Sequence, residues 1–223
     1  EFADCLDPGD VSQILDRQIA CNMEIAEEGL QRPYGARIGQ VLLASRGDDL
    51  VTRAKAYAAA ASDARMSGCE LPVCIISGSG NQGMTASIPV VIYARKWHTD
   101  EETLLRALLV SNLITVHQKT GIGCLSAYCG AISAGCGCGA GICYLKGGDY
   151  RAIAHTLVNA VAILSGTICD GAKPSCAAKI AMAVEAGIMG YEMTKAGHQF
   201  YSGDGIVTKG VENTIRNVGK LAR

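Results

Sequence analysis

The chain has 223 residues, which is enough for one large domain with a substantial buried core or for two small domains. Its 20 basic and 21 acidic side chains nearly cancel, and no basic run gathers anywhere, so the electrostatic footprint of a nucleic-acid-binding protein is missing. No apolar stretch approaches the roughly 20 residues that a membrane helix needs, and no secretory signal pattern occurs. We therefore expect a single domain over residues 1–223, located in the cytoplasm, with no nucleic-acid or membrane partner.

The composition favours a core of small side chains. Apolar residues make up 49% of the chain but aromatic residues only 5%, and 27 residues are glycine. The eleven cysteines are odd in number and too sparse for a small disulfide scaffold. We expect close contacts between backbones and reduced thiols, some of which are candidate ligands.

The first predicted elements are helices. Apolar residues recur at three- and four-residue steps over 11–30, where Asp10 is placed to cap the first turn. A shorter helix is expected over 37–45. The Ala-rich stretch 48–66 has the highest helix propensity in the chain and ends at a glycine.

Less regular segments occupy the middle of the chain. The short apolar run 71–76 fits either a strand or a buried helical turn, because periodicity alone does not separate the two. It leads into a Gly-rich stretch, after which 88–97 is another buried element. Thr99 and Glu102 have the spacing of a capping box, which predicts a long apolar helix that runs to about residue 119.

The last third is also predicted to be helical. Nearly every residue over 125–145 is small, so a helix there has to be packed on several sides by neighbouring backbones. Further helices are expected over 149–164 with Asp149 as the cap, over 174–194 with Pro174 in the first turn, and over 207–221. The predicted fold is mainly α, a single compact helical domain with Gly-rich loops and at most one short β segment.

Seven cysteines gather between positions 124 and 176: Cys124, Cys129, Cys136, Cys138, Cys143, Cys169 and Cys176. Zinc sites usually show Cys-x2-Cys or paired histidines, and neither pattern occurs here. Iron–sulfur clusters tolerate wider spacing, and Cys169 and Cys176 flank a tight turn at a helix start, where backbone N–H groups would stabilise a thiolate. The alternative is that these residues are small apolar core residues.

Four motifs follow one another in the chain: Ser77-Gly78-Ser79-Gly80-Asn81-Gln82-Gly83, Ala127-Tyr128-Cys129-Gly130-Ala131, Ile168-Cys169-Asp170-Gly171-Ala172-Lys173-Pro174-Ser175-Cys176 and Gly203-Asp204-Gly205. Together and in this order they resemble the L-cysteine desulfidase family, relatives of the α chain of bacterial iron–sulfur L-serine dehydratases. The resemblance covers nearly all of the chain.

The resemblance implies a [4Fe–4S] cluster that is held by three cysteines, which correspond to Cys129, Cys169 and Cys176. One iron would remain open to bind substrate as a Lewis acid, because elimination of sulfide or water from the β-carbon of an amino acid has a poor leaving group. A base must also take the α-proton. The expected products are pyruvate and ammonia, formed without pyridoxal phosphate from a small amino-acid substrate.

Substrate is expected to bind at the Gly-rich loop formed by Ser77, Gly78, Ser79, Gly80, Asn81, Gln82 and Gly83. Backbone N–H groups, hydroxyls and amides there supply directional hydrogen bonds to a small zwitterion. The alternative is a plain flexible turn. Asp170 and Asp204 are the catalytic candidates, since each could orient ligands or bind the substrate amine, although each could also cap a turn.

Some features depart from the family or leave alternatives open. Cys136, Cys138 and Cys143 stand where small residues are usual, so we interpret them as packing residues, with exchange of one of them for Cys129 as a ligand as the alternative. Family members are longer than this chain, which matches their C-terminal part. An N-terminal half or partner subunit is therefore expected to supply further active-site residues, including the base.

Three functions remain to be separated. The first is a lyase that acts on L-cysteine or L-serine, and the Gly-Asn-Gln-Gly loop and the seven-residue offset between Cys169 and Cys176 favour the desulfidase branch. The second is a non-catalytic amino-acid-binding or sensing domain. The third is a cluster-free helical domain. The small-residue surface also suits self-association, so we expect a homo-oligomer.

Overall fold

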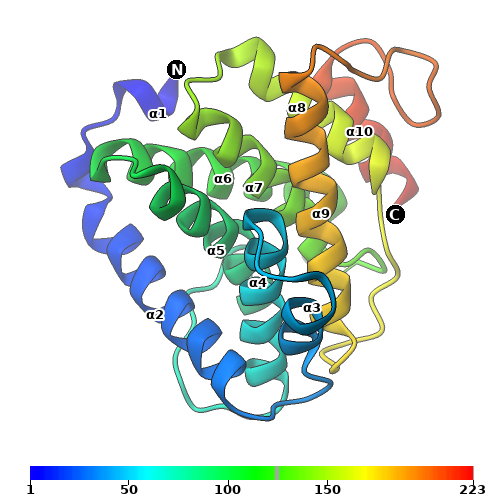
Figure 1. Cartoon of the computed structure of the whole chain (residues 1–223). Coiled ribbons are helices and arrows are strands. Elements are labelled where there is room, and N and C mark those ends of the chain that lie inside the picture. Colours follow the sequence, from blue (N-terminus) through cyan, green and yellow to red (C-terminus); the bar gives the residue numbers. More distant parts are fainter. Residues whose placement is uncertain (124–125, 223) are drawn as a thin grey trace.

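Helix α7 (Gly130–Leu145) is the central element of the computed structural model, which describes residues 1–123 and 126–222. Nearly all of its residues are buried, and α5, α6, α8 and α9 pack around it. Figure 1 shows the arrangement of the elements. Besides α7, the described residues form α1 (Phe2–Cys5), a 3-10 helix (Pro8–Asp10), α2 (Ser12–Gln31), α3 (Ile38–Arg46), α4 (Leu50–Met66), α5 (Gly80–Trp97), α6 (Glu101–Ile122), α8 (Tyr150–Ile163), α9 (Cys176–Lys195) and α10 (Val211–Leu221).

The small residues of α7 allow neighbouring backbones to approach closely. A Cβ placed on Gly135 would lie 2.2 Å from the carbonyl oxygen of Ala183, and one on Gly187 would lie 2.0 Å from the carbonyl oxygen of Gly135. These distances are far shorter than a carbon–oxygen contact allows, so α7 and α9 cross with their backbones in direct contact. The prediction that this helix is packed on several sides by backbones is confirmed.

The Ala-rich helix α4 is packed in a similar way. It lies against α2, α3, α5 and α9, and most of its alanines are completely buried. A Cβ on Gly29 of α2 would meet the carbonyl oxygen of Ala60 at 2.1 Å. Because its buried alanines present only methyl groups, several helices can approach α4 at once, and it forms a second centre of packing beside α7.

The ends of the helices differ in detail from the predictions. Asp10 does not cap α2, because it belongs to the 3-10 helix and Val11 is the capping residue. Asp100, rather than Thr99, caps α6, and its side chain accepts a hydrogen bond from the N–H of Thr103. Asp149 caps α8 as predicted and accepts from the N–H of Ala152.

Residues 71–76 form neither a strand nor a helical turn. The segment is irregular, and its β pairing is limited to a single bridge between Ile76 and Ser79. The N–H of Cys74 donates to Asn22 Oδ1 at 2.9 Å, and Asn22 Nδ2 donates to Ser87 Oγ at 2.9 Å. A buried amide therefore fixes this segment between α2 and α5.

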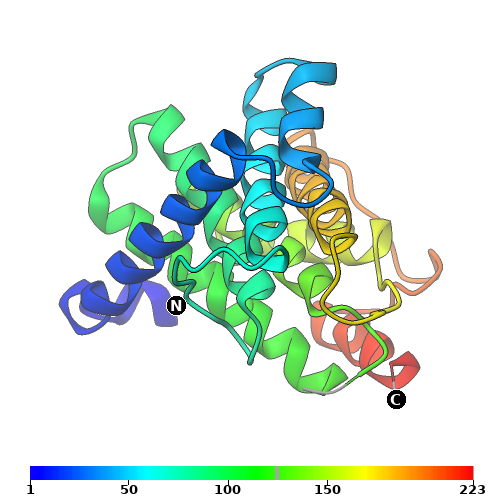
Figure 2. The ribbon, with the colours of Figure 1, turned by 90° about the horizontal axis from the view of Figure 1, so that it is seen from below.

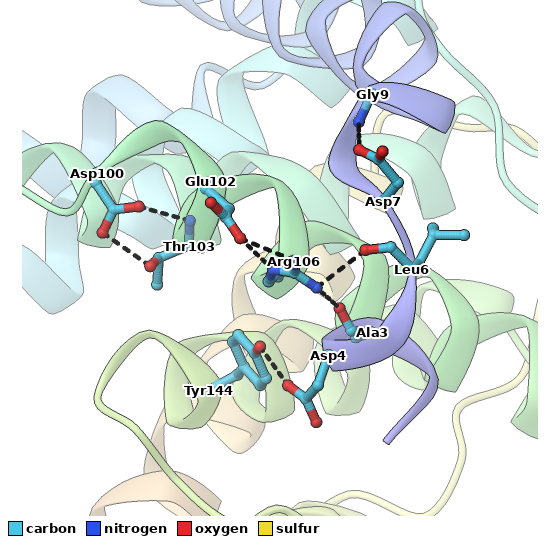
Figure 3. A network of polar contacts seen from close by, with 10 residues as sticks. All are labelled: Ala3, Asp4, Leu6, Asp7, Gly9, Asp100, Glu102, Thr103, Arg106 and Tyr144. Atoms are coloured by element: carbon cyan, nitrogen blue, oxygen red, sulfur yellow. Dashed lines mark hydrogen bonds and ion pairs between the residues drawn. The ribbon is translucent and has the colours of Figure 1, made fainter.

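The N-terminal helix α1 is fastened to the hairpin of α6 and α7, as Figure 3 shows. The Arg106 guanidinium donates to the backbone oxygens of Ala3 and Leu6, and it also pairs with Glu102 one turn away. The Tyr144 hydroxyl donates to Asp4 at 2.6 Å, and this bond holds the pKa of the Asp4 carboxyl below its usual value. These contacts order a helix too short to be stable alone.

The predicted fold class is confirmed, because the described residues form helices with only two isolated β bridges. Among these helices, none has both the length and the apolar character that crossing a membrane requires. Figure 2 shows that the loops leading into α5, α7 and α9 lie on the same side of the molecule. Those loops, together with the first turns of α5 and α9, carry all the predicted site residues except Asp204.

Candidate functional site

A short antiparallel contact between two loops brings Cys129 close to Cys169. Tyr128 and Ile168 form a β bridge, in which the N–H of Cys129 donates to the oxygen of Thr167 at 2.8 Å and the N–H of Cys169 donates to the oxygen of Ala127 at 2.7 Å. Neighbouring strands are about 4.8 Å apart in such a pairing. Each cysteine directly follows a bridged residue, so in this antiparallel pairing the two lie diagonally across the bridge on adjacent strands.

Cys176 joins this pair from the start of α9. It is the first residue of that helix, its thiol is buried, and its Sγ lies 3.5 Å from the oxygen of Gly171 in the turn that begins at Cys169. Cys129 is the N-cap of α7. Two of the three thiols thus stand at N-termini of helices that pack together, where the helix dipole favours a negatively charged sulfur.

Burial raises the pKa of the Cys129 thiol above its ordinary value, and the nearby thiols of Cys169 and Cys176 act in the same direction. The positive charge of Lys179, one turn into α9, opposes this rise. Lys179 donates to the oxygen of Ile168 at 3.1 Å and forms an ion pair with Asp170. The site therefore holds three thiols next to one fixed positive charge.

Asp170 contacts the candidate site through its ion pair with Lys179. The ion pair lowers the pKa of the Asp170 carboxyl and raises that of Lys179. A carboxylate with a lowered pKa is a weaker proton acceptor, so this geometry favours orientation of the lysine over general-base catalysis by Asp170. Its predicted catalytic role stays a prediction.

The thiols fit a cluster better than a single ion. Within residues 1–123 and 126–222, no three Cys, His, Asp or Glu side chains converge closely enough to hold one metal ion. Three thiols from separate segments, with a cation and two helix N-termini beside them, match the thiolate donors that hold iron–sulfur clusters. Cys129, Cys169 and Cys176 would hold such a group.

The other cysteines of the predicted constellation lie elsewhere. Cys136, Cys138 and Cys143 are buried inside α7, which agrees with their interpretation as packing residues. Burial raises the pKa of the Cys136 thiol to about 12, and the Cys138 thiol donates to the oxygen of Gly135 at 3.1 Å. Cys124 lies outside the described residues.

The predicted substrate loop is a tight turn followed by the first turn of α5. Ser77 and Gly78 have φ angles of 47° and 81°, and Ile76 and Ser79 exchange both backbone hydrogen bonds across them at 3.2 and 3.0 Å. Two central residues with positive φ are typical of a type I′ turn. The loop is therefore a hydrogen-bonded turn that leads directly into α5.

The N-terminus of α5 is buried but uncapped. Ser79 makes no side-chain capping bond, and among the described residues no acceptor takes the N–H groups of Gly80, Asn81 or Gln82, although all three residues are buried. Buried helix ends normally have such partners. Their absence here leaves a cluster of donors and a positive helix end that could receive an anion.

The two amides of the loop have different surroundings. The Asn81 Oδ1 faces Arg65 Nη1 at 3.2 Å and Ser62 Oγ at 3.4 Å, so this amide is engaged by α4. The Gln82 Oε1 is buried without a hydrogen-bond partner among the described residues. Its amide lies against Gly130, where a Cβ would be 2.4 Å from Nε2. Gln82 therefore connects the substrate loop to the residue that follows Cys129.

Asp204 is not brought to this site. It follows α9, whose 20 residues span about 30 Å, whereas the cysteines lie at the beginning of that helix. Its carboxylate accepts from the N–H of Tyr201 at 2.6 Å and closes the turn that contains Gly203 and Gly205. In Figure 1 this loop lies beside α8 and α10, so the catalytic role of Asp204 stays a prediction that its position does not support.

Two cations were missed from the sequence. Lys179 could have been found from its spacing, since it follows Cys176 by one helical turn and therefore faces the same side of α9. Arg65 gave no such signal, because it stands in an Ala-rich helix without a motif around it. Only the tertiary fold shows that it contacts the start of α5.

Sequence comparisons show which known proteins the chain is similar to. The family model described as the serine dehydratase alpha chain matches residues 4–223. Over its whole length the chain is 65% identical to a UPF0597 protein of Desulfitobacterium hafniense, 53% to one of Lachnoclostridium phytofermentans and 49% to one of Treponema denticola.

The chain spans about half the length of these relatives, covering 52%, 54% and 53% of them respectively. No solved structure was found to match it. The family match extends over all the helices that carry the thiols and the substrate loop. The chain therefore belongs to the serine dehydratase α-chain family.

Proposed function

We propose that this chain is the cluster-binding part of a lyase that eliminates sulfide from L-cysteine, or water from L-serine, to give pyruvate and ammonia. The observation that carries the proposal is that the Tyr128–Ile168 bridge and the turn into α9 bring Cys129, Cys169 and Cys176 into one region, next to the loop that contains Gln82. A [4Fe–4S] cluster with an open iron would, when bound, act as a Lewis acid on the leaving group.

The residues of the chain would have separate tasks in this reaction. The buried start of α5 and the Gln82 amide would bind and orient a small zwitterion beside the thiols. Lys179, held by Asp170, would offset the negative charge of the sulfur ligands. The group that takes the α-proton is proposed to come from the part of the relatives that this chain does not span, as a partner half or subunit.

The offset of seven residues between Cys169 and Cys176 and the Gly-Asn-Gln-Gly loop favour sulfide over water as the leaving group, on analogy with the desulfidase branch. A non-catalytic amino-acid sensor is the second candidate. The buried start of α5 and the unpartnered Gln82 amide support it, because they could bind an amino acid without turnover.

Iron and acid-labile sulfide should be measured per chain after anaerobic purification and reconstitution, and pyruvate release from L-cysteine and L-serine should be followed on the same sample. Four irons per chain with pyruvate from one substrate would support the lyase and identify its branch. A cluster without pyruvate from this chain, when the full-length relative from Desulfitobacterium hafniense releases it, would support a base in the part that this chain does not span. A cluster without pyruvate in both proteins would favour the sensor. No iron under these conditions would contradict both.

A further inference from the structure

Arg65 is a cation without a carboxylate partner at the start of α5. It extends from the last turn of α4, and none of the ion pairs among the described residues includes it. Its one hydrogen bond to a side chain runs from Nη1 to Asn81 Oδ1 at 3.2 Å. A guanidinium carries five N–H donors, so most of them remain available.

Gly80 makes room for this guanidinium. A Cβ on Gly80 would lie 2.6 Å from Arg65 Nε and 3.0 Å from its Cζ. The absence of a side chain therefore lets the arginine lie directly against the first residue of α5. The N–H groups of the buried residues Gly80, Asn81 and Gln82, which have no acceptor among the described residues, belong to the same helical turn. Positive charge from the side chain and from the helix end thus meets at one place.

Asn81 holds Arg65 in this position. Its amide oxygen accepts from both Arg65 and Ser62, and Asn81 and Ser62 are both buried. An asparagine that is engaged in this way cannot offer the same oxygen to a substrate amine. The side-chain oxygen of Asn81 therefore positions the arginine, while its backbone N–H belongs to the donors of the first turn of α5.

The buried Gln82 provides an independent sign that a ligand belongs here. Its side chain is 4% exposed, it lies in the first turn of α5, and its Oε1 lacks a hydrogen-bond partner among the described residues. A buried amide oxygen without a partner is costly unless a donor occupies the site. An α-amino acid has a group for each of these partners. Its carboxylate matches the Arg65 guanidinium and the positive end of α5, and its ammonium N–H groups match the Gln82 amide oxygen.

We infer that Arg65 binds the α-carboxylate of the substrate together with the first turn of α5, and so restricts the site to amino acids with a free carboxylate. This inference rests on the proposed function. Arginine suits the task because its planar donors match the two oxygens of a carboxylate. With the carboxylate held there, the amine would face Gln82 and the β-carbon would extend toward the cysteines.

The test is calorimetric titration of the chain with L-serine, L-cysteine and L-serinamide, which keeps the amine but lacks the carboxylate. The variant Arg65→Gln should weaken the binding of both amino acids roughly ten- to a hundredfold and leave the affinity for L-serinamide unchanged. Arg65→Lys should have an intermediate effect, since it keeps the positive charge but loses the planar pair of N–H donors that matches a carboxylate. Arg53→Gln is the matched control, because Arg53 lies on the same helix and pairs with the exposed Asp48.

Each result separates this inference from the proposed function. If Arg65→Gln binds L-serine and L-cysteine as the unmodified chain does, the inference is overturned while the proposed function stands. Equal loss of the amino acids and of L-serinamide would show that Arg65 only supports the loop, and would also overturn it. If the unmodified chain binds neither amino acid, the proposed function fails and the inference with it. Should Arg65→Gln fail to fold by circular dichroism, the Arg65→Lys titration decides.

Discussion

The amide of Gln82 lies directly against the Cα of Gly130, so that a Cβ on Gly130 would be 2.4 Å from Nε2 and 2.5 Å from Cδ. Gln82 belongs to the first turn of α5, and Gly130 is the first residue of α7, next to Cys129. This single contact joins the predicted substrate loop to the predicted cluster ligands. It therefore provides a direct test of whether the two motifs form one site.

Gly130→Ala should destabilise the chain by about 1–3 kcal/mol, because the added methyl group has to displace a buried amide. The double variant Gln82→Ala/Gly130→Ala should be destabilised by less than the sum of the two single variants. The reason is that alanine at position 82 removes the amide with which the new methyl group would clash. Urea unfolding of all four proteins gives the coupling free energy, which we expect to be at least about 0.5 kcal/mol. Strict additivity would mean that the two residues are not in contact.

The crossing of α7 and α9 leads to a second prediction. Gly187→Ala should destabilise the chain by about 3 kcal/mol or more, because its methyl group would meet the backbone oxygen of Gly135 and no flexible side chain can move aside. Gly121→Ala is the control, since a Cβ there meets nothing within 4 Å. It should raise the free energy of unfolding by up to about 1 kcal/mol through helix propensity.

Thermal and urea unfolding of the two glycine variants should therefore shift in opposite directions. If Gly187→Ala unfolds like the unmodified chain, α7 and α9 do not cross with their backbones in contact. Comparing the two variants also separates the effect of packing from that of helix propensity, because both substitutions replace a helical glycine by alanine.

Much of this packing was predictable from composition. A segment such as 130–145, with almost no large side chains, can only be stable as a helix if other backbones surround it, and the structure shows this arrangement. Helix ends were less predictable, because two neighbouring residues can both serve as a cap. Thr99 and Asp100 illustrate this, since the Asp100 carboxylate makes the bond to Thr103. The segment 71–76 has a β-like sequence but no partner strand among the described residues.

The candidate site was predictable only where a motif marks it. The three cysteines and the Gly-rich loop occur in recognisable patterns, and the fold brings them together. Arg65 carries no pattern, because its importance depends on the uncapped turn that it touches across the tertiary structure. Asp204 shows the opposite case: its motif is recognisable, but α9 separates it from the cysteines.

A third prediction concerns the ligand set. After anaerobic reconstitution, Cys176→Ser should lose most of the bound iron and the associated visible absorbance, because its thiol belongs to the group at the two helix N-termini. Helical content by circular dichroism should stay nearly unchanged. Cys138→Ser is the matched control, because this thiol is buried in α7 and its bond to the oxygen of Gly135 can be kept by a hydroxyl.

The control should retain the iron of the unmodified chain. Full absorbance in Cys176→Ser would remove this residue from the ligand set. Equal losses in both variants would indicate that iron binding depends on general stability rather than on the three thiols.

The last prediction concerns the pH dependence of stability and the buried Asp63 of α4. Its Oδ2 accepts from the N–H of Ile38 at 2.6 Å, at the start of α3, while burial raises the pKa of the carboxyl above its ordinary value of 3.8. The folded chain therefore holds this proton more tightly than the unfolded chain does. The contribution of Asp63 to the free energy of unfolding is consequently largest at low pH and is lost as the pH rises from about 4 through the raised pKa.

Other carboxyls act in the opposite direction. The bonds from Thr52 and Thr103 lower the pKa values of Asp49 and Asp100, so their contributions are present above the ordinary pKa and are lost as the pH falls through the lowered one. The Asp63 effect is therefore measured as a difference between the unmodified chain and Asp63→Asn, which removes one titrating group and can keep the bond to Ile38. Urea unfolding at a series of pH values should show the unmodified chain losing stability relative to Asp63→Asn as the pH rises. A constant difference between the two proteins over this series would mean that the pKa of Asp63 is the same in the folded and unfolded chains.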